Sequence, residues 1–311
     1  MKIRSPLSVA SLIISLVATA NLSKASETRP HAVAVDGILC DLVRTISSSN
    51  VKVSCLVPPT GDPHFYKLKP SDKINLSSAN VIFHNGYQLT PLVNKLPSEI
   101  KTIAVGEVAL NIKEDPQDNF IDPHVWHDPN NISLMATTIE ANLKDYIPVY
   151  QWTELNNRTN KVKSTLSTLS SWITTQIDTI PVSNRVITSE HRAFSHLAKK
   201  FNMQEMPIID SFSTKGKMRP SDLKRITSDL SKLGTRELLP ETFPASKTLK
   251  RVSRASGIPI SKTQLFLDGL APDMSTVETA ISNVCAISIS QGGTCDQISA
   301  EKISSQWKNI P

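Results

Sequence analysis

The stretch from Tyr150 to Ile177, YQWTELNNRTNKVKSTLSTLSSWITTQI, contains neither glycine nor proline. Its apolar residues recur at helical spacing and form one narrow stripe, at Leu155, Val162, Leu166, Leu169, Trp172, Ile173 and Ile177. Polar residues occupy the rest of each turn, which is typical of a helix that packs on one side only. The pattern predicts one helix of more than 25 residues within the segment 150–180.

On both sides of this helix, short apolar segments alternate with helical patterns. Before it, we expect strands at His31–Asp36, Val51–Val57 and Val81–His84, and helices at Ile38–Ser47, from Pro70 and over Asn130–Tyr146. After it, we expect strands at Arg185–Thr188, Met206–Ile209, Glu237–Leu239 and Gln264–Leu267, and helices at Phe194–Phe201, Ser221–Leu233 and Ser246–Ser256. Such alternation is typical of parallel sheets. The sequence therefore predicts an α/β fold with two βα lobes, residues 26–149 and 181–311, joined by the single long helix, residues 150–180.

The composition is that of a water-soluble globular protein, with 39% hydrophobic and 20% charged residues among 311. These values exclude a multi-span membrane protein and a disordered chain. The formal net charge is +6, but aromatic residues make up only 5% and no block of Lys or Arg is present. We therefore expect no nucleic-acid partner.

The first residues have the order of a secretory signal peptide. Lys2 and Arg4 precede the uncharged apolar run Leu7–Ala20, and small residues suited to cleavage follow, the last of them Ala25. A membrane anchor is the alternative, but this run of 14 residues is shorter than the roughly 20 needed to span a bilayer. We expect a signal peptide over residues 1–25 and a mature protein that is exported, soluble and periplasmic.

The four cysteines are informative once export is expected, because disulfides form in oxidising compartments. Cys40 and Cys55 are 15 residues apart, Cys285 and Cys295 are 10 apart, and three pairings are possible. Two local loops, Cys40–Cys55 and Cys285–Cys295, are the simplest assignment. A cysteine metal site is disfavoured because no C-x-x-C spacing occurs.

The tripeptide Asp-Pro-His occurs twice, in DPHFY at 62–66 and in DPHVW at 122–126. Each proline fixes a turn that holds the next residue extended, and each histidine, His64 and His124, is close to aromatic residues. His191 follows the strand RVIT and Asp268 follows the strand QLFL, at the carboxyl ends where open α/β sheets bind ligands. Three imidazoles and a carboxylate are a suitable ligand set for a first-row transition metal such as zinc.

The other histidines are expected to have structural roles. His31 opens the mature chain, His84 ends a strand and His196 lies on a helix face. His127 is nearest to the predicted site, but an extended backbone would direct its ring away from His124.

The motifs DPHFYKLKPSD, DPHVWHDPNN, TSEHRAFSHLA and LFLDGL occur in this order, with NG after VIFH. Together they resemble the metal-binding extracytoplasmic solute-binding proteins of zinc and manganese ABC transporters (cluster A-I). The resemblance covers nearly the whole mature chain. It implies two lobes joined by one long helix, a divalent metal ion bound between them, and a permease in the membrane as partner. It also implies His64, His124, a third histidine or glutamate, and Asp268 as ligands, with no catalytic residues; we expect a monomer.

The third ligand position can be placed in two ways. Counting back from Ala193–Phe194 selects His191, whereas counting forward from the end of the strand selects Glu190. We favour His191, and therefore zinc; Glu190 would give a more oxygen-rich set that suits manganese. The His-rich loop of many zinc-type members is absent from Asn111–Ile121, which removes one argument for zinc.

The alternatives from other classes are a secreted zinc hydrolase and an adhesin. A secreted zinc hydrolase needs an open coordination position for water and a general base, and no H-E-x-x-H motif is present. An adhesin of the same fold would bind a partner without metal. We expect a carrier, not an enzyme, in which Phe65, Tyr66 and Trp126 form the walls of the metal site.

Overall fold

The computed structural model describes residues 29–112, 121–212, 217–219 and 221–311. The predicted signal peptide and residues 113–120 of the segment Asn111–Ile121 lie outside the described residues. No helix in these ranges is both long and apolar enough to cross a membrane.

A four-stranded parallel sheet forms the first half of the molecule, in the order β2-β1-β3-β4. Its strands are β1 (His31–Ala34), β2 (Lys52–Cys55), β3 (Val81–His84) and β4 (Lys101–Ala104). Its helices are α1 (Gly37–Ser47), α2 (Pro70–Ser77), α3 (Val105–Leu110) and α4 (Pro129–Leu143). Three strands were predicted. β4 was missed because its four residues, KTIA, are partly polar and carry no clear alternation.

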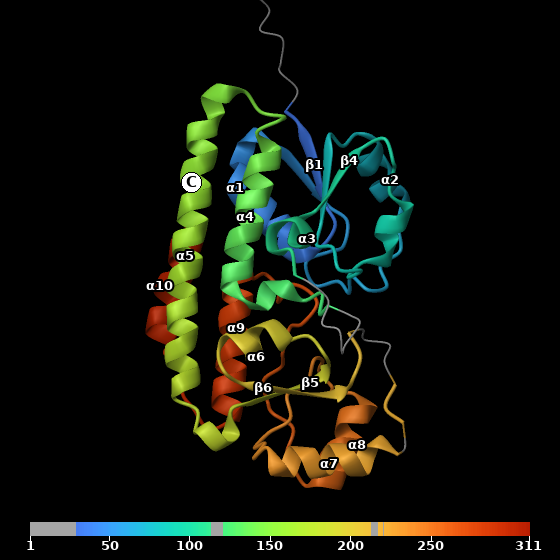
Figure 1. Cartoon of the computed structure of the whole chain (residues 1–311), viewed down its shortest axis with the longest axis vertical. Coiled ribbons are helices and arrows are strands. Elements are labelled where there is room, and N and C mark those ends of the chain that lie inside the picture. Colours follow the sequence, from blue (N-terminus) through green and yellow to red (C-terminus); the bar gives the residue numbers. More distant parts are fainter. Residues whose placement is uncertain (1–28, 113–120, 213–216, 220) are drawn as a thin grey trace, which may run out of the picture.

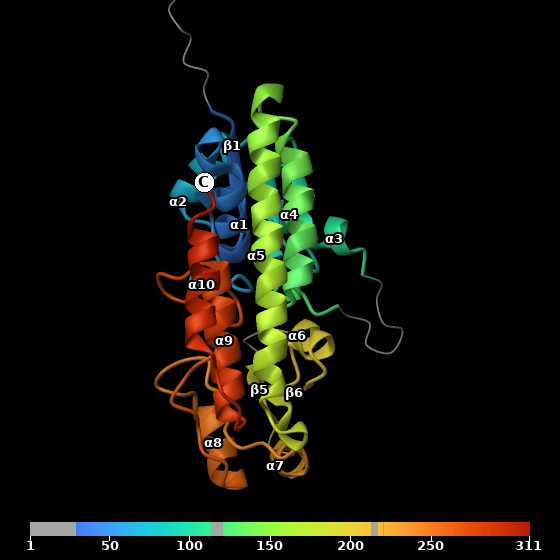
Figure 2. The same cartoon turned by 90° about the vertical axis from the view of Figure 1, so that its left-hand side faces the viewer.

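The predicted long helix is α5 (Trp152–Asp178), of 27 residues. It runs along most of the molecule in Figures 1 and 2 and packs against α1 and α4 of the first half and against α9 (Thr276–Ser290) and α10 (Gln297–Lys308) of the second. Its apolar stripe is buried as the sequence predicted, since Leu155, Val162 and Leu169 are inaccessible to solvent.

The second half of the molecule contains a smaller sheet, in which β5 (Val186–His191) pairs in parallel with β6 (Gln204–Ile209). Its helices are α6 (Ser195–Lys200), α7 (Asp222–Lys232), α8 (Lys247–Ser256), α9 and α10. One sheet thus precedes α5 and the other follows it, which confirms the α/β fold with parallel sheets and one long helix.

Two predicted strands of the second half do not form. Glu237–Leu239 makes only a single bridge, between Leu238 and Ile260, because Pro240, the next residue, has no N–H to continue a ladder. Gln264–Leu267 is not part of a strand, and the side chain of Asn283 accepts from the Phe266 N–H and donates to the Phe266 carbonyl, at 2.8 Å each. These bonds satisfy groups that a neighbouring strand would otherwise pair with.

The largest apolar core extends through both halves of the molecule. It contains Leu39 of α1, Ile139 of α4, Leu166 of α5 and Val284 of α9. The predicted disulfides are both present: Cys40–Cys55 links α1 to β2, and Cys285–Cys295 links α9 to the segment before α10. The boundaries of the lobes at residues 149 and 181 stay predictions, because α5 packs against both halves.

Candidate metal centre

The two Asp-Pro-His motifs build the same local turn. The Asp62 carboxylate accepts a hydrogen bond from the His64 amide at 2.8 Å, and the Asp122 carboxylate accepts one from the His124 amide at 3.0 Å. Such a bond from an aspartate to the backbone two residues on closes a tight turn. Each turn fixes its histidine at a loop on the carboxyl-end side of the first sheet.

The second half of the molecule supplies the other two predicted residues. His191 is the last residue of β5, and Asp268 follows the segment 264–267. The Leu270 amide donates to the Pro59 carbonyl at 2.7 Å, and this bond holds the segment that contains Asp268 against the first half. A side chain at Gly269 would collide with the same carbonyl, since its Cβ would lie 2.4 Å from Pro59 O.

The structure brings His64, His124, His191 and Asp268 together, with one candidate ligand atom from each inside a span of 4.8 Å. Asp268 Oδ1 lies 3.1 Å from His64 Nε2, 3.2 Å from His124 Nε2 and 3.3 Å from His191 Nε2. His64 Nε2 and His124 Nε2 are 3.2 Å apart. The three imidazoles are buried, and Asp268 is the common partner of their Nε2 atoms. Three nitrogens and one oxygen therefore converge on one point from two halves of the chain.

Glu190, the alternative third ligand, is outside this cluster. Neighbouring residues of a strand point to opposite faces, so the two side chains diverge although both belong to β5. The Glu190 carboxylate accepts from the Glu241 amide at 3.4 Å and lines an adjacent cavity. The geometry of β5 thus favours His191 as the residue that faces the cluster.

Two further carboxylates hold the rings of the cluster. Asp122 Oδ1 lies 2.7 Å from His124 Nδ1. Glu241 contacts His191 Nδ1 with both oxygens, at 3.1 and 3.0 Å, and accepts from the His191 amide at 3.0 Å. Carboxylates in such positions fix the tautomer and orientation of a metal-binding imidazole. Sequence reasoning missed Glu241; the available signal was its position two residues beyond the expected strand Glu237–Leu239.

The carboxylates also control the protonation of the cluster. Burial would lower the pKa of His124, but Asp122 and Asp268 outweigh it and raise that pKa to about 9. Burial also opposes charge on His191, yet hydrogen bonds to Asp268 and Glu241 raise its pKa to about 10. Burial would raise the pKa of Asp268, but its bonds to the three histidines hold it well below its usual range. Without an ion, the cluster therefore retains protons at neutral pH.

The remaining histidines lie outside the cluster. His31 contacts Ser78 and Ser54, and His196 Nε2 lies 2.9 Å from the Asp122 carbonyl. His127 belongs to a 3-10 turn, where Nε2 is 3.1 Å from the Leu267 carbonyl and the ring packs on Phe194. Burial lowers the pKa of His127 to about 3.

The aromatic residues of the two motifs differ in position. The Trp126 ring lies 5.3 Å from the His124 ring and the Phe65 ring lies 6.2 Å from the His64 ring. Tyr66 instead donates its hydroxyl to Asp72 at 2.9 Å and packs against a different apolar cluster. The expectation that Tyr66 forms a wall of the site is wrong, because the hydrogen bond to α2 turns its side chain away.

The profile of the family described as zinc-uptake complex component A, periplasmic (ZnuA), matches residues 33–287. The match covers most of the chain, so the protein belongs to this family. The motifs had predicted the same class, the extracytoplasmic solute-binding proteins of metal ABC transporters.

Several characterised proteins are similar over most of their length. A metal ABC transporter substrate-binding lipoprotein of Lactococcus lactis is 26% identical over 273 residues, 83% of this chain and 86% of the relative. The iron-binding protein YfeA of Yersinia pestis is 24% identical over 289 residues, 89% and 92% of the two chains. The manganese-binding lipoprotein MntA of Halalkalibacterium halodurans is 25% identical over 246 residues, 78% and 81% of the two chains.

Solved structures share the fold. The periplasmic zinc-binding protein TroA of Treponema pallidum superposes with a TM-score of 0.77 at 20% identity, over 85% of this chain and 99% of its own. Fe(III)-bound YtgA of Chlamydia trachomatis also gives 0.77, at 22% identity, over 86% and 99% of the two chains. The relatives and these structures name zinc, manganese and iron, so membership of the family does not select one metal.

Proposed function

We propose that the protein captures a divalent transition-metal ion in the periplasm and delivers it to the membrane permease of an ABC importer. The observation that carries the proposal is the convergence of His64, His124, His191 and Asp268, which would bind the ion as ligands. Three imidazoles, once deprotonated, and a carboxylate suit a transition metal. Four protein ligands would leave no open position for a nucleophilic water, which favours a carrier over a hydrolase.

The spacing of the ligand atoms supports zinc as the cargo. Four ligands about 2.0–2.1 Å from a tetrahedral ion are separated from one another by about 3.3 Å. Four of the six distances between these atoms run from 3.1 to 3.3 Å, and all four atoms lie within 4.8 Å of one another. Zinc accepts this geometry readily, whereas manganese prefers more oxygen ligands.

Metal analysis of the protein purified from its own periplasm, without added metal, tests this proposal. We expect about one zinc ion per chain, and loss of the ion in His191→Ala. Manganese that is retained in His191→Ala and lost in Glu190→Ala would contradict both the third ligand and the metal. Absence of any bound ion from the wild-type protein would contradict the function itself.

Metal binding would connect the two halves of the molecule, because His64 and His124 precede α5 whereas His191 and Asp268 follow it. The shared core and α5 oppose a large hinge movement, so we expect small tilts and loop shifts on binding. The permease would distinguish the loaded form by these shifts.

Glu241→Gln should lower the affinity for Zn²⁺ by about 10- to 100-fold, the usual effect of losing the carboxylate partner of a ligand. Gln can still accept from the His191 amide, but it cannot hold the Nδ1 proton with two anionic oxygens. Competition with a chromophoric chelator measures the change. Glu237→Gln, four residues away, is the control; equal affinities of the two variants would contradict the role of Glu241.

Zinc binding at pH 7 should release about two protons per ion, because His124 and His191 must lose theirs to become ligands. Their raised pKa values mean that affinity increases as the pH rises from 7 toward 9. Titration calorimetry in buffers of different ionisation enthalpy counts the protons. An affinity that is flat over this interval, with no proton release, would contradict the assignment.

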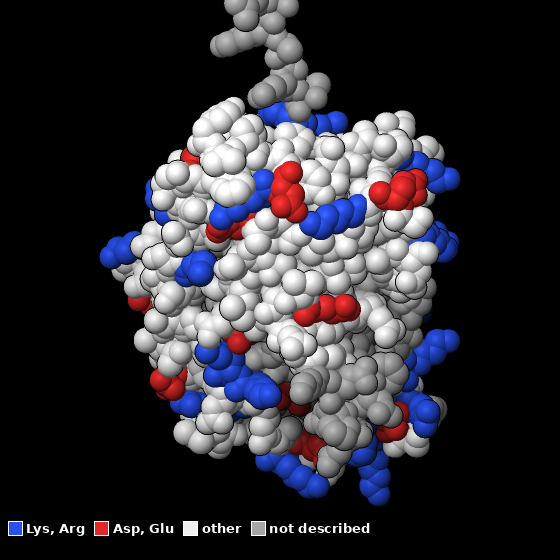
Figure 3. Space-filling model, turned by 45° about the horizontal axis from the view of Figure 1, so that its top comes forward, with Lys and Arg blue, Asp and Glu red and all other residues white. Residues whose placement is uncertain are grey.

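We further propose that the protein acts as a monomer without a nucleic-acid partner. Lys and Arg side chains are interspersed with Asp and Glu on the face shown in Figure 3 and form no continuous basic stripe there. Sedimentation velocity at micromolar concentration tests the monomer: a dimer as the dominant species would contradict it.

A further inference from the structure

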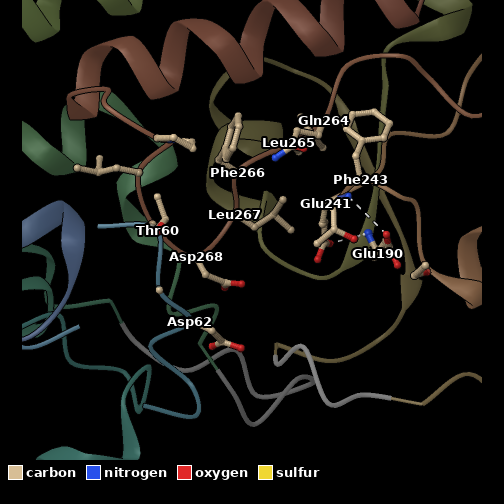
Figure 4. Close-up of a pocket in the computed structure, with 16 residues that line it drawn as sticks. Thr60, Asp62, Glu190, Glu241, Phe243, Gln264, Leu265, Phe266, Leu267 and Asp268 are labelled. Carbon is tan, nitrogen blue, oxygen red and sulfur yellow. Dashed lines mark hydrogen bonds between the residues drawn. The ribbon is translucent and has the colours of Figure 1, made fainter. Parts of the chain in front are cut away.

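A cavity of about 650 Å³ adjoins the metal-binding cluster, and Asp268 is one of the residues that line it. Its lining combines residues 60–62 of the first half with β5, residues 241–246 and residues 264–272 of the second (Figure 4). Thr60, Thr242 and Pro272 are exposed, whereas Leu265 and Leu267 are buried. The cavity therefore leads from the surface to a carboxylate of the cluster.

The charged residues of this lining are all acidic. Asp62, Glu190, Glu241 and Asp268 contribute carboxylates, and none of the lining residues that the structure describes is Lys or Arg. In Figure 4, Asp62 and Asp268 lie along one side of the cavity, and Glu190 and Glu241 lie together farther along it. A concave surface with charge of one sign concentrates counter-ions and accelerates their arrival.

Glu190 differs from the other three carboxylates because it neither belongs to the cluster nor forms a hydrogen bond with one of its histidines; it accepts from the Glu241 amide at 3.4 Å. Glu241 holds His191, Asp268 belongs to the cluster, and Asp62 closes the turn before His64. Glu190 is only 9% exposed, yet its side chain faces the cavity. Placing a carboxylate in a buried position costs free energy, so its location beside the cluster calls for an explanation.

Asp268 connects the cavity to the cluster, because it lines the cavity and belongs to the cluster. Its Oδ1 lies 3.3 Å from Nε2 of His191, a residue that is only 1% exposed. A cation that reached Asp268 through the cavity would meet this nitrogen next.

We propose that this cavity is the path by which the hydrated divalent cation reaches the cluster, and that Glu190 is the carboxylate that holds the ion before it passes to Asp268 and His191. Carboxylate oxygens bind hydrated cations readily and can replace water one ligand at a time. The inference rests on the proposed function, since it concerns the route of the same ion. Glu190 then captures the incoming ion, and it controls the rate at which the metal ion associates with the protein.

Stopped-flow mixing of the metal-free protein with Zn²⁺ tests the path, with tryptophan fluorescence as the signal because the Trp126 ring lies 5.3 Å from the His124 ring. Glu190→Gln removes one charge with little change of shape, and Thr60→Lys adds an opposing charge at the exposed rim. The matched control for Glu190→Gln is Glu301→Gln on α10, outside the lining of the cavity. The matched control for Thr60→Lys is Thr60→Gln.

We expect both test variants to associate about threefold to tenfold more slowly than their controls at low salt, with the difference shrinking as added salt screens the charges. Each variant should still bind one ion per chain at equilibrium. Association rates equal to those of the controls at every salt concentration would overturn the path while leaving the carrier function intact. A wild-type protein that binds no Zn²⁺ in equilibrium dialysis would instead overturn the carrier function.

Discussion

Asp268→Asn is expected to lower the affinity for Zn²⁺ by about 10³-fold or more, since losing only an outer partner of a ligand already costs 10- to 100-fold. The Asp268 carboxylate lies within 3.3 Å of all three imidazole nitrogens, so it is the common anion of the cluster. Asparagine preserves the shape but removes the negative charge that would balance the ion.

The same substitution should also change the protonation of the metal-free protein. Asp268 is one of the groups that raise the pKa of His124 and of His191, so both pKa values should fall in the variant. Fewer protons would then remain to be released at pH 7 by any ion that still binds. Loss of affinity together with loss of proton release distinguishes a ligand from a residue that merely supports the fold.

Asp273→Asn is the matched control for this experiment. Asp273 is exposed, lies five residues farther along the chain, and has a φ of 57°, which asparagine adopts easily. Chelator competition at pH 7.5 gives the two affinities, and circular dichroism checks that both variants fold. Affinities of the two variants within threefold of each other would remove Asp268 from the proposed ligand set.

Arg158→Met is expected to destabilise the protein by about 2–4 kcal/mol, because two main-chain carbonyls would lose a charged donor at about 1–3 kcal/mol each. Arg158 is completely buried on α5. Its guanidinium donates to the Ile46 carbonyl at 2.6 Å and to the Ser47 carbonyl at 3.3 Å, and it pairs with Glu154. These bonds cap the last turn of α1 from the side of the long helix.

Urea unfolding of Arg158→Met beside Lys163→Met measures this effect. Lys163 lies on the same helix but is exposed, so its replacement changes charge and length without breaking a buried contact. We expect the unfolding midpoint to fall for Arg158→Met only. Equal midpoints would mean that the carbonyls of α1 find other partners, and that the arginine is not needed to join the two helices.

The parts of the structure that could be predicted from the sequence are those determined by local pattern. The stripe on α5 depends on spacing within one helix, and each Asp-Pro-His turn depends on a bond between residues two apart. These signals are complete within a few residues of sequence. His191 was separable from Glu190 by the alternation of a strand, once β5 was known to extend that far.

The parts that were missed depend on contacts between distant residues. Asn283 satisfies the backbone of Phe266 from 17 positions away, so the segment before Asp268 is not a strand. Glu241 reaches His191 from 50 positions away, and its position just beyond an expected strand does not identify that partner. Tyr66 turns toward Asp72 because α2 begins there. Each of these outcomes follows from tertiary packing, which overrides local preference.

The apolar core that crosses from α1 through α5 to α9 has a consequence for unfolding. Each half also has a smaller apolar cluster of its own, but the largest core is shared, because α5 contributes buried residues that contact both halves. Denaturation should therefore proceed in one cooperative transition, and a fragment cut at the end of α5 should not fold alone. The metal ligands thus come from two halves of the chain, whereas we expect the whole chain to unfold as one cooperative unit.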